Sequence, residues 1–255
     1  MTIGNGTEQE VTFVAAHLAA HEGHFDRRNA DFQSLVQNLV FPDQTGIFKR
    51  NTPLFFLGDL NYRLSVLHPS RSATKLSISP DNDNFDDLSL IEILKEAILD
   101  FLETGRFHKL VPHDQLPLSP LALHLSEAPI NFSPTYKYIS HDPPTYANNR
   151  TPSWTDRILF SPETIRTTDY KSTTCDTFSD HQAVSLTAVL RDEDFDAEEG
   201  VMPWSVNPNW RGRREFADKL AYIAGTMEFM GESKIGVSVF LGLVIGSMFY
   251  LYYNS

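Results

Sequence analysis

The sequence predicts an α/β sandwich followed by a C-terminal helix that crosses a membrane. Three observations support this fold class. The composition is that of a globular protein, with 41% hydrophobic and 21% charged residues among 255. Apolar runs typical of strands alternate with segments of helical spacing. An uncharged apolar stretch, about long enough to span a membrane, stands near the end of the chain.

The predicted elements begin as strand, helix and strand. Val11–His17 is rich in apolar and β-branched residues, which favours a strand. Arg27–Val40 has helical spacing and ends before Pro42, and Pro53–Gly58 is a short apolar run typical of a buried strand. Beyond a polar loop at 68–87, we expect a helix at Leu88–Leu102 and strands at Ile130–Phe132, Arg157–Ser161 and Val184–Leu190.

The charge balance restricts the partners of the protein. Lys and Arg total 21 against 33 Asp and Glu, so the net charge is −12. This acidity argues against nucleic acid as a partner, because non-specific binding needs a broad basic face. An anionic substrate must instead be held by a few local cations. The one cysteine, Cys175, excludes internal disulfides and a zinc site built from cysteines.

The C-terminal region is predicted to contain a linker and an anchor. Residues 191–234 start with a run of acids and continue with prolines and a basic cluster, which is typical of an extended linker. Within it, residues 217–230 can form an amphipathic helix, and Trp204 and Trp210 either pack on the domain or lie at a membrane. Residues 235–253 carry no charge and predict a tail anchor in the endoplasmic reticulum membrane, with the preceding chain on the cytosolic face. A buried core helix is the alternative.

Candidate catalytic residues stand beside the predicted strands. Asp59 and Asn61 come directly after the buried strand, where α/β proteins place their sites, as a general base and an orienting donor. Asp156 and the pair Asp180-His181 precede later strands, and an imidazole fixed by a carboxylate is suited to a phosphate or a proton. Taken singly, each also fits a turn or an ordinary surface residue.

Other polar residues are candidates for binding. His17 and His21 lie four residues apart, but no third ligand is spaced nearby, which disfavours a zinc site. Lys137 and Arg150 supply cations and Tyr136 supplies a hydroxyl, a set suited to a phosphate group. Single exposed Lys and Tyr residues are otherwise common on any surface.

Together, the ordered segments HLAAH, GDLNYR, PTYKY, PSWTDR and SDH resemble the inositol polyphosphate 5-phosphatases of the endonuclease/exonuclease/phosphatase superfamily. The resemblance covers roughly Val11 to Leu190. It gives a catalytic domain at 1–190, a linker at 191–234 and a membrane anchor at 235–253. Because of this anchor, the chain further resembles fungal tail-anchored phosphatidylinositol 4,5-bisphosphate 5-phosphatases.

The resemblance implies two β-sheets packed between helices and Mg²⁺-dependent removal of the 5-phosphate from phosphatidylinositol 4,5-bisphosphate or a related inositol phosphate. It implies that Asp59 activates the attacking water. Asn61 and His181 would hold the scissile phosphate, Asp156 would orient His181, and Asp180 would lie beside the metal or the water. Substrate contacts are implied for His17, His21, Tyr136, Lys137 and Arg150.

The sequence departs from the family pattern at two places. The family carries a metal-binding Glu and an Asn upstream of HLAAH, whereas only Met1–Glu10 precede that strand here, and Gln9-Glu10 is a weak substitute. We therefore expect a fragment of a longer enzyme, with an inactive short form as the alternative. Asn148 stands where the family often has a Lys, which leaves the choice between lipid and soluble substrates open, although an anchor favours a lipid.

Three functional hypotheses remain from the sequence. The first is a membrane-anchored phosphoinositide 5-phosphatase. The second is a catalytically inactive phosphoinositide-binding membrane protein, because the upstream metal ligand is missing. The third is a nuclease, which the acidic charge, the PTYKY segment and the tail disfavour. The pair Gly242 and Gly246 is weak support for helix pairing, so the oligomeric state stays open.

Overall fold

The fold is known from a computed structural model of the chain. It describes residues 2–3, 7–64, 96, 98–101, 104–106, 109–141, 144–147, 149–174, 179–191 and 204–232. The chain divides into two compact units, Met1–Ser205 and Val206–Ser255. Each unit is described separately below.

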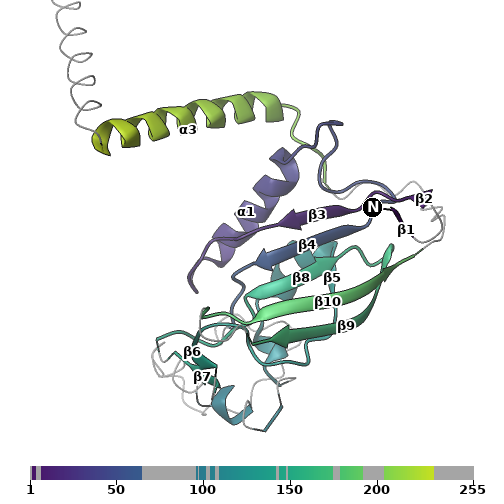
Figure 1. Cartoon of the computed structure of the whole chain (residues 1–255), viewed down its shortest axis with the longest axis vertical. Coiled ribbons are helices and arrows are strands. Elements are labelled where there is room, and N and C mark those ends of the chain that lie inside the picture. Colours follow the sequence, from purple (N-terminus) through teal and green to yellow (C-terminus); the bar gives the residue numbers. More distant parts are fainter. Residues whose placement is uncertain are drawn as a thin grey trace, which may run out of the picture. The chain divides into compact units, whose positions relative to one another are not determined.

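A four-stranded sheet forms the centre of the first unit (Figure 1). Its order is β3 (Thr12–Ala15), β4 (Leu54–Asp59), β8 (Asp156–Phe160) and β5 (Ser126–Glu127). β3 runs parallel to β4, whereas β8 is antiparallel to both of its neighbours. The strands predicted at 11–17, 53–58 and 157–161 are thus confirmed, with ends moved by one or two residues.

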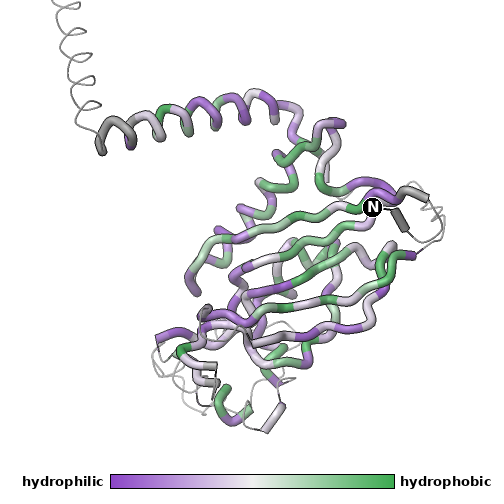
Figure 2. Tube along the Cα trace, viewed as in Figure 1, coloured by the Kyte–Doolittle hydropathy of each residue, from purple (hydrophilic) through white to green (hydrophobic). Residues whose placement is uncertain are grey.

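Helix α1 (Phe25–Asn38) covers one face of this sheet, as the spacing at 27–40 predicts. Its buried Phe32 and Val36 pack with Val14 of β3 and Phe56 of β4 in the main hydrophobic cluster. Figure 2 shows hydrophobic colour along the central strands β3 and β4. On the opposite face, Phe13 stacks on Phe55 with ring centroids 5.1 Å apart.

A second pair of strands lies beside β8 (Figure 1). β9 (Ile165–Thr173) and β10 (Ala183–Leu190) form an antiparallel hairpin. The sequence predicts β10 but not β9, because only Ile165 and Tyr170 of β9 are buried and the rest of the strand is polar. The strand predicted at Ile130–Phe132 is wrong. That segment is irregular, and the carbonyl of Phe132 accepts a hydrogen bond from the buried Trp154 indole instead of a strand partner (3.0 Å).

Short elements complete the described part of the first unit. Two small hairpins pair β1 (Thr2–Ile3) with β2 (Thr7–Glu8) and β6 (Tyr138–His141) with β7 (Pro144–Tyr146). Three single 3₁₀ turns lie at Val111–His113, Leu116–Leu118 and Leu121–Leu123. Of the helix predicted at 88–102, only residues 96 and 98–101 are described, and they are helical. The predicted loop at 68–87 lies outside the described residues.

A buried charge cluster joins β8 to β5 and to the link between the first two 3₁₀ turns. The Arg157 guanidinium donates to Asp114 (2.8 Å), to both carboxylate oxygens of Glu127 and to the Trp154 carbonyl. The Tyr170 hydroxyl also donates to Glu127 (2.8 Å). Because a buried cation without partners is very costly, this complete set of partners offsets the cost of burying Arg157.

The C-terminal side contains one long helix. α3 (Trp210–Glu232) includes the predicted helix at 217–230 and begins seven residues earlier. Among the described residues, no helix is both long and apolar enough to cross a membrane. The anchor predicted at 235–253 and much of the acidic linker lie outside those residues. Trp204, in the first unit, packs against Phe32 and His124, so it docks on the domain.

Candidate active site

The strand register brings distant motifs to one edge of the central sheet. Asp59, at the end of β4, pairs directly with Asp156, at the start of β8. Isolated bridges join Tyr136 to Ser153 and to His181. The segments GDLNYR, PTYKY, PSWTDR and SDH therefore meet at this edge.

Gly58 lets the backbone of β4 pass close to the chain at the end of β3, just before Asp59. Its φ of +128° is unfavourable for other residues, and a Cβ atom there would lie 2.2 Å from the Ala16 carbonyl oxygen. Asp59 is mostly buried, and its Oδ2 atom lies 3.4 Å from His17 Nε2. Burial raises the pKa of Asp59, and the negative charge of Asp156 raises it further.

Asp156 and His181 form a carboxylate–imidazole pair. His181 Nδ1 lies 2.9 Å from Asp156 Oδ2, and the hydroxyls of Thr135 and Thr155 donate to the same oxygen at 2.7 and 2.9 Å. Burial alone would lower the pKa of His181, but the hydrogen bond and charge of Asp156, aided by Asp59, outweigh it and raise the pKa. The imidazole is therefore biased toward its protonated form, which can donate to an anion.

Asn61 is placed differently from the expectation. Its side chain is 1% exposed, its Nδ2 donates to the Leu18 carbonyl (3.1 Å), and its Oδ1 accepts from Arg63. The backbone N–H of Asn61 donates to Asp59 Oδ1 (3.1 Å), and its φ is +56°. In this arrangement Asn61 holds the backbone beside Asp59, while the oxygen and one N–H of its own amide are engaged by protein groups.

Lys137 and Asp180 form an ion pair beside His181. Lys137 Nζ donates to Asp180 Oδ2 at 2.6 Å, and this hydrogen bond lowers the pKa of Asp180 and raises that of Lys137. The Tyr136 ring lies against the His181 ring, with centroids 4.5 Å apart. Tyr136 and Lys137 are thus close to the catalytic candidates, as their motif predicts.

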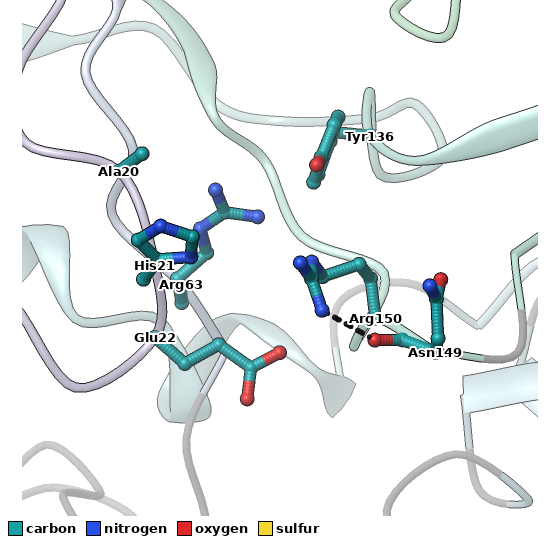
Figure 3. Close-up of a pocket in the computed structure, with 7 residues that line it drawn as sticks. All are labelled: Ala20, His21, Glu22, Arg63, Tyr136, Asn149 and Arg150. Carbon is teal, nitrogen blue, oxygen red and sulfur yellow. Dashed lines mark hydrogen bonds between the residues drawn. The ribbon is translucent and has the colours of Figure 1, made fainter.

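A cavity of about 220 Å³ adjoins these residues. It is smaller than a typical binding site for a whole drug-sized ligand, so it suits one charged part of a substrate. Figure 3 shows Glu22 and Arg150 facing each other, with Arg63 beside His21 and with Tyr136 apart from them. The lining residues are Ala20, His21, Glu22, Arg63, Tyr136, Asn149 and Arg150.

Three of the charged or polar lining residues have no role in the sequence prediction: Glu22, Arg63 and Asn149. Arg63 ends the GDLNYR segment, and that motif was its only signal. The guanidinium of Arg63 lies 4.6 Å above the Tyr136 ring. Glu22 and Asn149 carry no local pattern, because only folding brings their loops together.

Arg28 fixes the loop that carries His21 and Glu22. Its fully buried guanidinium donates to the carbonyls of Ala19, His21 and Glu22 and to the Gln115 side chain. Burial, together with the positive charge of Arg63, lowers the pKa of Arg28 to about 10. The loop after β3 is therefore held by a side chain of α1.

The described residues contain no group of three or more His, Cys, Asp or Glu side chains that could hold a metal ion. Asp59 fits a single ligand position, because burial and Asp156 leave its charge poorly compensated. Asp180 fits less well, since Lys137 already neutralises it. Glu10, considered as a substitute ligand, pairs with Lys49. A hard cation here would take few protein ligands and complete its shell with water and phosphate oxygens.

Comparison with known proteins identifies the class. Residues 1–187 match the family model described as Endonuclease/Exonuclease/phosphatase family 2, and the chain belongs to this family. Its relatives within the family are inositol phosphate phosphatases, as the motifs predict. It is 30% identical over 186 residues to the type II inositol 1,4,5-trisphosphate 5-phosphatase of Mus musculus, covering 69% of this chain and 16% of that protein.

Two further relatives are also inositol polyphosphate 5-phosphatases. The type IV inositol polyphosphate 5-phosphatase 11 of Arabidopsis thaliana is 30% identical over 73% of this chain and 50% of its own length. A solved inositol polyphosphate 5-phosphatase domain of SPsynaptojanin, in complex with inositol (1,4)-bisphosphate and calcium ion, matches with a TM-score of 0.51 and 27% identity. That match covers 70% of this chain and 47% of the solved one. The chain spans half or less of the length of these proteins. The structural match confirms the fold that the family resemblance implies.

Proposed function

We propose that the protein removes the 5-phosphate from phosphatidylinositol 4,5-bisphosphate, or from a related inositol phosphate, in a Mg²⁺-dependent reaction. The observation that carries this proposal is the meeting of Asp59, Asp156 and His181 at one sheet edge, next to a cavity with two arginines. The names of the relatives support the substrate class.

In the proposed mechanism, the side chains of this chain position a water and a phosphate. Asp59 accepts a proton from the attacking water, which its raised pKa favours, as the water oxygen bonds to phosphorus. The ester P–O bond breaks in the same step, and the leaving ring oxygen takes a proton from solvent. Protonated His181, held by Asp156, donates to an oxygen of the scissile phosphate. Tyr136, Lys137 and Arg150 contact a neighbouring phosphate, and Lys137 does so while paired with Asp180.

Mg²⁺ is the proposed cation. Because Asp59 acts as the base in this mechanism and Asp180 is paired with Lys137, the ion would be held mainly by phosphate oxygens and water. When bound, such an ion supplies charge neutralisation at the phosphate oxygens. The solved relative contains calcium ion, another cation that prefers oxygen ligands.

The direct test measures phosphate release from short-chain phosphatidylinositol 4,5-bisphosphate by the full-length chain. We expect release that needs Mg²⁺ and stops with EDTA. Asp59→Asn should lower the rate by about 10²- to 10⁴-fold, because it removes the base. Glu163→Gln makes the same charge change on an exposed turn and should leave the rate unchanged. Equal rates for the parent and Asp59→Asn would contradict the proposal.

A second candidate is a phosphoinositide-binding protein without turnover. The placement of Asn61 favours it, since this side chain is buried and both its oxygen and one of its two amide N–H groups are engaged by the protein. Tight binding of the same lipid without phosphate release would select this function.

We also propose that residues 235–253 anchor the protein to the endoplasmic reticulum membrane with its domain in the cytosol. The support is the uncharged sequence of that segment. Removal of residues 235–255 should move the protein from the membrane fraction to the soluble fraction. Continued membrane association of the shortened chain would contradict the anchor.

A further inference from the structure

Arg63 is a buried cation whose donors are only partly used. The side chain is 4% exposed, and its Nη2 donates to Asn61. Its Nε and Nη1 atoms are buried without a hydrogen-bond partner among the described residues. Leaving buried charged donors unpaired is costly, so native proteins nearly always supply an acceptor. Because Arg63 lines the cavity, the missing acceptor is expected to be an anionic ligand.

Glu22 places a negative charge in the same cavity. Its Oε1 accepts the backbone N–H of Thr151 at 3.1 Å, and Arg28 holds its carbonyl, so the residue is fixed at both ends. Figure 3 shows its carboxylate directed toward Arg150 across the cavity. The lining therefore has two cations, Arg63 and Arg150, opposed by one anion.

This charge balance limits the number of phosphates that the cavity accepts. A phosphate monoester carries about −1.5 to −2 charges at pH 7. One such group is matched by the two arginines, whereas a second would face Glu22. Lys137, which is not among the lining residues, is already paired with Asp180. Like charges at short range in a partly desolvated site repel strongly, and such repulsion is a common source of specificity.

We propose that Arg63 and Glu22 together determine substrate specificity: Arg63 binds one ring phosphate, and Glu22 excludes headgroups that carry an additional phosphate. The identity of the ring as an inositol phosphate rests on the proposed function. The selectivity by charge is a binding property and is independent of turnover.

The test measures binding by the full-length chain in EDTA, where no turnover is expected. The two probes are short-chain phosphatidylinositol 4,5-bisphosphate and phosphatidylinositol 3,4,5-trisphosphate, which differ by one ring phosphate. Glu22→Gln keeps an oxygen for the Thr151 N–H and removes the charge. We expect it to raise the affinity for the trisphosphate about tenfold more than that for the bisphosphate.

Three further variants complete the design. Asn149→Asp adds a carboxylate at an exposed lining position and should weaken binding of the trisphosphate more than binding of the bisphosphate. This variant tests the proposal even where Glu22→Gln does not fold. Arg63→Met should lose most of the affinity for both probes. Glu163→Gln, outside the cavity, should change neither.

The proposal would be overturned if each of the variants Glu22→Gln and Asn149→Asp changed the affinity for the two probes by the same factor. Failure of the parent chain to bind either probe would also overturn it. Selective binding in EDTA, together with no phosphate release when Mg²⁺ is supplied, would instead reject the proposed 5-phosphatase activity and leave this inference standing. The two failures are therefore distinguishable.

Discussion

Arg157 and Arg63 are both almost fully buried, and both stand in segments that define the family, yet their surroundings differ. Arg157 lies between Asp114 and Glu127, which together occupy all of its nitrogen atoms. Arg63 donates to Asn61 and lies over the Tyr136 ring, and two of its nitrogen atoms have no hydrogen-bond partner among the described residues. A buried guanidinium with a complete set of partners stabilises the fold, whereas one with open donors is prepared for a ligand.

Arg28 is an intermediate case. Its guanidinium donates to three carbonyls and to Gln115, but Nε has no partner among the described residues. Its partners are neutral, so it holds a loop without forming an ion pair. The three arginines therefore predict a graded series of effects on stability, which substitution by Met can test.

The largest loss of stability is expected for Arg157→Met. It leaves the Asp114 and Glu127 carboxylates buried without a cation, which costs about 3–5 kcal/mol. Urea unfolding of the full chain in detergent measures this loss, and Arg166→Met, on an exposed part of β9, is the matched control.

The loss should also depend on pH. Burial already raises the pKa of Asp114, and removal of Arg157 raises it further, so the folded state binds a proton more tightly than the unfolded state. The destabilisation of Arg157→Met should therefore shrink as the pH falls. A loss below about 1 kcal/mol at neutral pH would show that the cluster is not structural.

A smaller loss is expected for Arg28→Met. The change leaves the carbonyls of the loop at residues 19–22 without their donor, which costs about 1–3 kcal/mol. Arg27→Met, one residue earlier on α1, removes only an exposed pair with Asp31 and should cost less than about 1 kcal/mol. Equal losses for the two variants in the same urea experiment would refute the loop-holding role.

The smallest loss is expected for Arg63→Met. Relief of the buried, unpaired donors offsets the lost hydrogen bond to Asn61, so the free energy of unfolding should change by less than about 1 kcal/mol. The parent chain should gain thermal stability from added inorganic phosphate, and the variant should not. A loss as large as that of Arg157→Met would remove the distinction between the two arginines.

Much of the site was predictable, because its residues stand in short motifs next to strands. Asp156 and His181 are in contact as the resemblance implies, and Tyr136 lies beside them. Asn61 shows the limit of this reasoning, because its motif indicates a polar contact but not that Arg63 and Leu18 provide it. The strand β9 was missed for a related reason, since two buried residues in nine give no clear periodicity.

The sequence by itself determined three of the four strands of the central sheet, the helix that covers it, the family and the candidate catalytic residues, because local periodicity and short motifs are encoded by neighbouring residues. The tertiary structure decided which charges are compensated and which remain open. Arg157 meets acids 43 and 30 residues away, and Glu22 reaches a backbone N–H 129 residues away. Burial and partner choice are properties of such distant contacts, so only the folded chain distinguishes a structural arginine from one that awaits a ligand.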